Sequence, residues 1–273
     1  MLSKVEVRNV QGGLLSLELT DISDGIVLRN IEGLDPVKAT IVSSSFAQQD
    51  GTQYHSSRRE ERNITMELML QPDYINTNVR DLRYRLYEYF MTKSEVKLRF
   101  FDSDGPTVDI VGRVESCEAP LFAKEPQMDI SVLCSDPDFV DPTAVTISGN
   151  TTASTTETLL QYPGTVETGV NFTLNINRTL TEFTIYFRSP DGSLTSMDIA
   201  GSFVTGDVLK ISTIPGAKGA TLTRGGTTSS VLYAVSPQSN WFQLLQGDNH
   251  IRVYAEGAAI PYTLSYNTRY GGL

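Results

Sequence analysis

Alternation of apolar and polar residues dominates the first half of the chain. Apolar side chains at Val5 and Val7, at Leu15–Leu19 and at Ile64–Leu70 are separated by polar neighbours. A period of two residues is typical of a strand with one buried face. The same reasoning predicts further strands at Val37–Val42, Val96–Phe100, Val108–Val114 and Gln127–Cys134.

One helix is predicted among these strands, over residues 78–92. Its apolar residues, Val79, Leu82, Leu86, Tyr89 and Phe90, recur at helical spacing, and an apolar stripe of this kind ordinarily packs on a sheet. Either Asn76 or Asn78 can cap the helix by accepting a hydrogen bond from a free amide of the first turn. We therefore expect an α+β module, a sheet or small barrel with one helix across it.

Residues 43–58 break the pattern because they are polar and contain few core-forming side chains. The segment is predicted to be a long exposed loop or the tip of a hairpin. Long loops in compact domains are often functional, although a loop that is merely solvated is an equal alternative.

The second half of the chain reads as strands and turns throughout, which predicts an antiparallel β-sandwich. Trp241, the only tryptophan, either anchors the core of this sandwich, which is the commoner role, or stacks on a sugar. The predicted strands are Phe172–Ile176, Phe183–Phe187, Leu194–Ile199, Val208–Ile211, Ala220–Leu222, Val231–Val235, His250–Tyr254 and Tyr262–Tyr266.

Charge divides the chain at the same place as the pattern does. Residues 1–141 have a net charge of −9 and residues 142–273 have only −1, and the proline-rich bend Asp136–Pro142 lies between them. Two domains, 1–141 and 142–273, are therefore expected. An acidic chain is a poor candidate for sequence-specific binding to nucleic acid, which needs basic surface.

The sequence predicts no enzyme, cofactor or metal site. The two histidines, His55 and His250, are not accompanied by a nucleophile motif, and no phosphate-binding glycine loop is present, although a glycosidase carboxylate pair would leave no local signature. Cys117 and Cys134 are expected to be free buried thiols. The chain has no apolar run suited to a membrane span or a signal peptide, which predicts a soluble chain made in the cytoplasm.

Several segments in order form a recognisable series. They are Gly33–Pro36, Asp50-Gly51, Arg58 and Arg62 leading into the strand at Ile64, the helix, Val132–Phe139, Phe203–Ile211 and Ser239–Asn249. This series resembles the distal tail protein of long-tailed bacteriophages, the siphophage tail component family, which implies synthesis in the host cytoplasm. The resemblance covers essentially the whole chain. One departure is Gln246, where proline is expected before a Gly-Asp-Asn turn.

The resemblance implies a ring-forming, split-barrel or tail-tube-like domain followed by a galectin-like sandwich. It implies a homohexameric ring at the tip of the virion tail, which joins the tail tube protein to the tail hub protein. Such a ring docks receptor-binding or other baseplate proteins and leaves a central channel for DNA. Acidic side chains in the ring module would repel the passing phosphates.

A closed ring needs a surface that reaches the neighbouring subunit. The candidate is the segment Gln48–Arg62, with Asp50, Gly51, Tyr54, Arg58 and Arg62 as its interface residues. Arg58 and Arg62 are expected to pair with carboxylates of the neighbour, and ordinary surface charge is the alternative.

The competing function is a carbohydrate-binding adhesin. In that interpretation the sandwich binds a host cell-surface glycan, and Asn240 and Trp241 face the glycan or a protein partner.

Overall fold

The computed structural model describes residues 2–19, 24–47, 50–120 and 125–273, which form two compact units. The first contains Met1–Pro142 together with Tyr270–Leu273, and the second contains Thr143–Arg269. The last four residues thus belong to the first unit, whereas the sequence placed them in the second. The predicted fold class is confirmed, because the chain is mainly β with one α-helix and its sheets are antiparallel.

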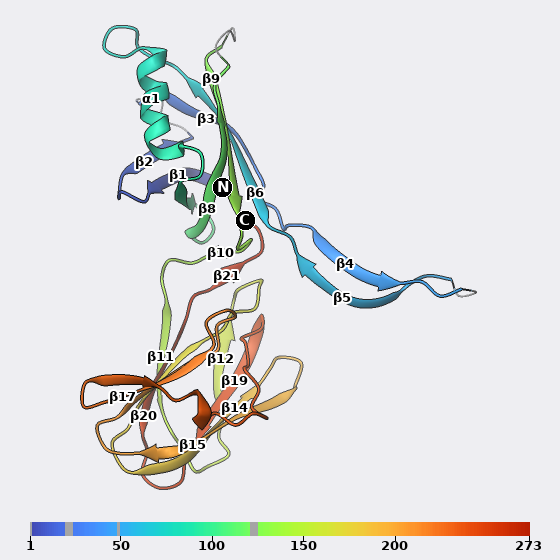
Figure 1. Cartoon of the computed structure of the whole chain (residues 1–273), viewed down its shortest axis with the longest axis vertical. Helices are drawn as coiled ribbons and strands as arrows, with labels where there is room; N and C mark the ends of the chain where they lie inside the picture. The colour runs from blue at the N-terminus through green and yellow to red at the C-terminus, as the bar shows by residue number, and fades with distance from the viewer. Residues whose placement is uncertain (1, 20–23, 48–49, 121–124) are drawn as a thin grey trace. The chain divides into compact units, whose positions relative to one another are not determined.

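The first unit is built on a sheet with the strand order β2-β1-β7-β8-β9-β6-β3 (Figure 1). The inward side chains of these strands and of the helix form one hydrophobic core. The strands are β1 (Leu2–Asn9), β2 (Leu14–Glu18), β3 (Ile26–Glu32), β6 (Arg62–Leu70), β7 (Glu95–Asp102), β8 (Val108–Glu118) and β9 (Gln127–Cys134), with two short strands at one end, β10 (Phe139–Val140) and β21 (Arg269–Tyr270).

Helix α1 (Val79–Phe90) confirms the expected amphipathic stripe, because Leu82, Leu86 and Phe90 are its buried residues. Of the two predicted caps, Asn78 is the one used. Its Oδ1 accepts a 3.1 Å hydrogen bond from the backbone N–H of Asp81, and the Asp81 carboxylate accepts one from the backbone of Asn78. This reciprocal capping box satisfies two of the free amides at the helix start.

The strands β4 (Ala39–Ser44) and β5 (Gln53–Arg59) pair only with each other in the described part of the chain, as a separate two-stranded sheet. Of the two predicted alternatives for the polar segment, the hairpin is therefore correct. Its second strand was not predicted, because Gln53–Arg59 has no apolar period.

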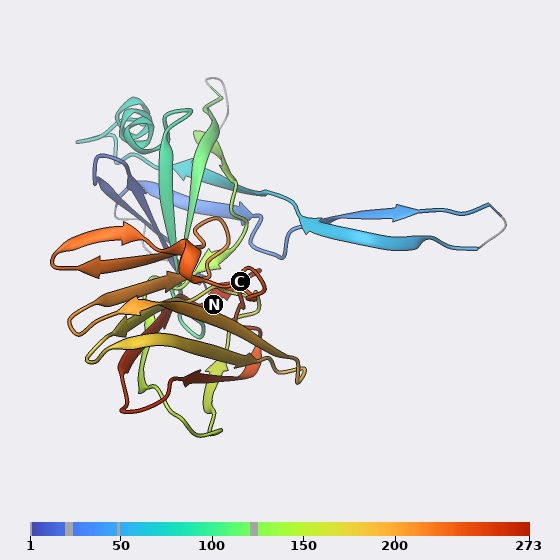
Figure 2. The same cartoon turned by 60° about the horizontal axis from the view of Figure 1, so that its bottom comes forward.

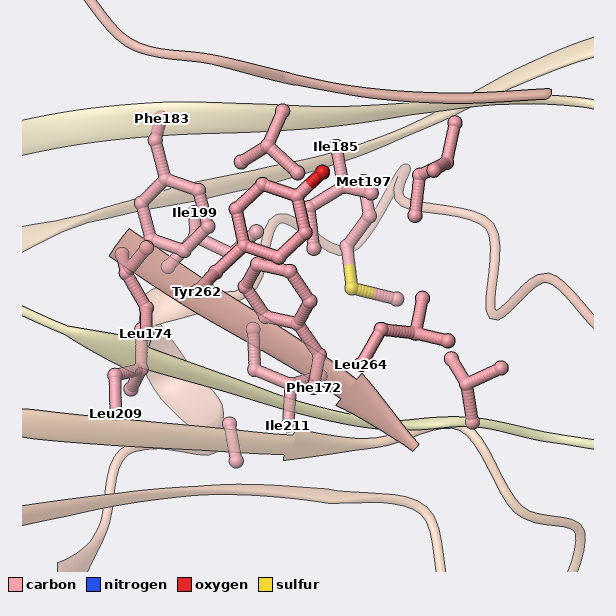
Figure 3. Close-up of a cluster of buried hydrophobic side chains, with 14 of the residues drawn as sticks. Phe172, Leu174, Phe183, Ile185, Met197, Ile199, Leu209, Ile211, Tyr262 and Leu264 are labelled. Carbon is pink, nitrogen blue, oxygen red and sulfur yellow. The ribbon is translucent and has the colours of Figure 1, made fainter. Parts of the chain in front are cut away.

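The second unit is a sandwich of two sheets with the orders β11-β20-β13-β16-β17-β18 and β12-β19-β14-β15. Figure 3 shows side chains of both sheets meeting in its core, where the rings of Phe172 and Tyr262 lie 5.0 Å apart. The strands are β11 (Val145–Asn150), β12 (Thr158–Tyr162), β13 (Asn171–Asn175), β14 (Leu180–Arg188), β15 (Leu194–Phe203), β16 (Val208–Ser212), β17 (Gly219–Arg224), β18 (Thr227–Ser230), β19 (Gly247–Tyr254) and β20 (Pro261–Tyr266).

One predicted strand of this unit is wrong. Val231–Val235 contains a short 3₁₀ helix, η1 (Leu232–Ala234), instead of a strand. Val231, Ala234 and Val235 are buried, while Leu232 and Tyr233 face solvent. This spacing is helical, and the alternation of Val, Tyr and Val that suggested a strand is too short to distinguish the two.

Candidate assembly surface

The β4–β5 hairpin is the most exposed regular structure of the first unit. Figure 1 and Figure 2 show it extending away from the nine-stranded sheet. Its apolar side chains face solvent: Ile41 is 64% exposed and Tyr54 is 61% exposed, and Val42 and Phe46 are exposed as well. Exposed apolar side chains gathered on one element make the hairpin a candidate interaction surface.

Local pairing gives the hairpin a defined register. Ile41 lies opposite Ser57, and a bulge follows the pair of Val42 and Ser56. The hydroxyls of Tyr54 and Ser57 are hydrogen-bonded at 2.8 Å, and Ser44 Oγ lies 2.7 Å from His55 Nε2. An isolated two-stranded hairpin with no buried face is marginally stable in water, so this one gains most from a partner that covers it.

The base of the hairpin is fixed to the body of the first unit. The Arg59 guanidinium forms a two-pronged ion pair with the buried Asp138 carboxylate, with Nη2 donating to Oδ2 at 3.0 Å. Thr40 Oγ1 donates a 2.7 Å hydrogen bond to Glu60 Oε1. The orientation of the hairpin is therefore set at its root, while its outer part is free to meet another molecule.

Arg62 follows the hairpin and lies in a different environment, with only 1% of its surface exposed. Its guanidinium donates to four backbone carbonyls, those of Pro137 at 2.6 Å, Asp35 at 2.7 Å and Gly271 at 2.6 Å, and that of Gly33. It also lies over the Phe139 ring, 4.4 Å from the centroid. Burial lowers the pKa of this guanidinium, which the neighbouring Asp138 carboxylate opposes.

The structure thus separates the predicted interface residues. Asp50, Gly51, Tyr54 and Arg58 are exposed on the hairpin, with Gly51 at φ +89° near its tip. Arg62 is used inside its own unit, contrary to the expectation that it pairs with a neighbouring subunit. The first residues of the predicted segment, 48–49, lie outside the described residues.

The inward position of Arg62 had a signal in the sequence. Ile64, Met66, Leu68 and Leu70 are the buried side chains of β6, and Arg62 occupies the same register. A charged residue at an inward position of a strand must find polar partners, and here the carbonyls of three other segments supply them.

An acidic hollow of about 350 Å³ lies on the first unit, lined by residues of β3, β6, β8 and β9. Glu32, Glu67, Glu118 and Asp129 contribute its carboxylates. These residues show where part of the negative charge of the first unit is concentrated.

Trp241 is partly buried and packs against the core of the sandwich, in keeping with the commoner of its two expected roles. Asn240 is exposed, and its backbone N–H donates a 3.0 Å hydrogen bond to Ser196 in β15. Asn240 therefore lies along the edge of the four-stranded sheet, while the tryptophan ring contributes to packing.

Within the described ranges, no group of three or more His, Cys, Asp or Glu side chains is arranged to hold a metal ion. No helix in those ranges has the length and apolar character needed to cross a membrane.

Two family models match the chain, one on each unit. The phage tail protein RIFT-related domain matches residues 17–110, and the C-terminal domain of the siphovirus-type tail component matches residues 163–270. The chain belongs to the siphovirus-type tail components. None of the curated proteins matches it.

A solved structure of a phage protein shares the fold of this tail component. The crystal structure of SPP1 Dit, described as a paradigm of the hub adsorption apparatus in phages infecting Gram-positive bacteria, has a TM-score of 0.68 and 16% identity, over 97% of this chain and 98% of that chain. A chain of the phage P2 baseplate in its activated conformation with calcium has a TM-score of 0.49 and 9% identity, with full coverage of both chains.

Proposed function

We propose that this tail component forms a closed ring of six copies at the distal end of a phage tail, in which each hairpin covers the first unit of the next copy. The exposed hairpin carries the proposal. At about 3.3 Å per residue its seven-residue strand spans roughly 20 Å, enough to reach across a neighbouring domain. A surface used in this head-to-tail manner closes into a ring when the rotation between copies permits it.

The ring would join the tail tube to the tail hub and leave a channel for DNA. The acidic hollow beside Glu67 and Asp129 is the candidate lining of this channel, because carboxylates repel phosphate and keep DNA from adhering. The sandwich would then be the docking platform for receptor-binding or other baseplate proteins. The matches to phage tail families and the fold shared with SPP1 Dit support this placement in the virion.

The ring proposal is tested by mass photometry and negative-stain microscopy of the purified chain. We expect annular particles with a central hole. A variant in which residues 42–56 are replaced by a two-residue turn should remain a folded monomer. A matched control shortens the exposed turn at Pro190–Gly192 of the sandwich and should leave the ring intact. Monomers at every concentration and in tail extracts, or rings that survive loss of the hairpin, would overturn the proposal.

The adhesin alternative has no support at the tryptophan proposed for it, because Trp241 contributes to core packing. A different aromatic residue of the sandwich is exposed, and it leads to a separate inference.

A further inference from the structure

The four-stranded sheet of the sandwich has one face turned away from the core. Along β14 the side chains of Phe183, Ile185 and Phe187 are buried, and those of Glu182 and Thr184 alternate with them on the opposite face. Thr184 lies opposite Asp198 of the edge strand β15. The outer face therefore gathers hydroxyls and carboxylates at this end of the sheet.

A hollow of about 300 Å³ lies at this end, with both polar and apolar residues in its lining. Its polar lining comes from Glu182, Thr184, Asp198 and Ser236, and Tyr233 is its exposed aromatic residue, since the other aromatic residue of the lining, Phe183, is buried. The volume is at the lower end of the range of about 300–1,000 Å³ that small-molecule sites occupy.

Tyr233 is displayed by the local fold. It is 85% exposed, on the 3₁₀ turn that buries Val231, Ala234 and Val235 beneath it. A β-bridge between Val235 and Ile199 fixes this turn against β15. An exposed ring on a short anchored turn binds without a large loss of conformational entropy, as tyrosines in binding loops do.

The carboxylate opposite the ring is also held in place. Thr184 Oγ1 donates a 2.8 Å hydrogen bond to Asp198 Oδ1. The backbone of Asp198 is hydrogen-bonded to the Ser239 hydroxyl and to the backbone N–H of Ser236, both at 2.9 Å. Within the part of the chain that the structure describes, the Glu182 carboxylate and the Tyr233 hydroxyl have no hydrogen-bond partner, so both are available to a ligand.

We propose that this hollow binds a sugar unit of a neutral polysaccharide. A pyranose ring has one face of C–H groups, which would pack on Tyr233, and a rim of hydroxyls, which would donate to Asp198 and Glu182. The lining contains two carboxylates and, among the described residues, no lysine or arginine. Arg224 interacts electrostatically with Tyr233, but its guanidinium is paired with Asp207, so anionic sugars and phosphates are disfavoured. A polysaccharide continuing along the sheet would meet Tyr186, over whose ring the Arg252 guanidinium lies at 4.1 Å.

The test uses the purified full-length chain on a glycan array that carries neutral hexose, N-acetylhexosamine and deoxyhexose oligosaccharides beside uronic-acid and phosphorylated ones. The strongest ligand is then titrated by calorimetry. We expect a neutral glycan to bind, Tyr233→Ala and Asp198→Asn each to weaken binding at least tenfold, and Tyr233→Phe to retain it. Tyr84→Ala, which removes an exposed tyrosine of the first unit, is the matched control and should bind like the parent chain.

Three outcomes would overturn the inference. The first is that the chain binds no neutral glycan on the array, and the second is that it prefers acidic glycans. The third is that Tyr233→Ala and Asp198→Asn both bind the neutral glycan as the parent chain does and have its melting temperature. If the parent chain binds no glycan but binds another tail protein, and Tyr233→Ala abolishes that protein binding, the face is assigned to protein docking instead. Ring formation is measured separately, so failure of either proposal leaves the other standing.

Discussion

Arg62 donates a 2.6 Å hydrogen bond from Nη2 to the carbonyl oxygen of Gly271, a residue 209 positions later in the chain. The same guanidinium binds the loop at Gly33 and Asp35 and the segment at Pro137. A single buried cation therefore connects three distant segments of the first unit to the strand that it begins.

Replacing Arg62 by methionine should destabilise the first unit by about 3–5 kcal/mol, because four buried carbonyls lose their donor. Arg62→Lys should recover only part of this loss, since an ammonium cannot reproduce the planar fork of donors. Urea unfolding combined with hydrogen exchange of β6 peptides measures the effect. Arg58→Met, at an exposed position, should change stability by less than about 0.5 kcal/mol. Equal effects at the two arginines would contradict the prediction.

Deleting the last four residues should destabilise the first unit by about 2–4 kcal/mol. The deletion removes the Gly271 acceptor, the 3.1 Å hydrogen bond from Leu273 N to Leu34 O, and the partly buried Tyr270 ring. Gly272→Val should destabilise the first unit less than the deletion does. Its Cβ would lie 2.7 Å from Pro36 Cδ, so the two segments would have to move apart.

Combining the deletion with Arg62→Met gives a direct check on this pairing. The two losses should be less than additive, since both remove the hydrogen bond between Arg62 and Gly271. Full additivity in urea unfolding would show that the deletion acts elsewhere.

The second unit should lose stability in acid through Asp207. Hydrogen bonds from Arg224, at 2.8 and 2.6 Å, hold the pKa of this buried carboxyl below its usual value. A depressed folded-state pKa stabilises the fold above the unfolded value of about 3.9, and this contribution disappears as the pH falls through the folded value. Asp207→Asn should lower the free energy of unfolding of the second unit by about 1 kcal/mol at pH 7, and by progressively less towards pH 3. The loss is this small because the half-exposed Arg224 is screened by solvent.

Fluorescence of Trp241, the single tryptophan, reports the melting of the second unit that this prediction concerns. Asp248→Asn, at an exposed position of β19, is the control and should show no comparable pH dependence. A difference between parent and Asp207→Asn that is constant from pH 7 to pH 3 would exclude the assigned role.

Both thiols should be unreactive in the native chain. Burial raises the pKa of Cys117 and of Cys134 to about 11, which leaves about one thiol in a thousand ionised at pH 8. Ellman's reagent should therefore label the native protein slowly. In 6 M guanidinium, where the chain is unfolded, it should label both cysteines at once. Rapid labelling of Cys134 in the native state would be incompatible with its buried position in β9.

Much of the fold follows from local periodicity. The strand at Ile64–Leu70 and the helix over 78–92 are predicted because their buried faces repeat every two and every 3.6 residues. The structure has them as Arg62–Leu70 and Val79–Phe90. The hairpin strand Gln53–Arg59 has no such signal, because all its side chains face solvent. Only its backbone hydrogen bonds to β4 define that strand, and such hydrogen bonds do not affect the hydropathy pattern of the sequence.

The candidate sites show the same limit. Tyr233 was predicted to lie in a strand, and only the turn that carries it reveals an exposed ring beside Asp198. Arg62 was assigned to a subunit interface because charge suggests surface. The partners that bury it come from residues 33, 35, 137 and 271, whose proximity depends on the tertiary fold.

The pairing of β10 with β21 places the point where the chain leaves the first unit beside the point where it returns. The sandwich is thus a continuous insertion in the first unit, and the pairing of β10 with β21 holds the two ends of the insertion together. Another compact domain whose termini lie close together could replace the sandwich at this position without interrupting the fold of the first unit. Such an exchange would leave the nine-stranded sheet and the carbonyl ligands of Arg62 in the first unit unchanged.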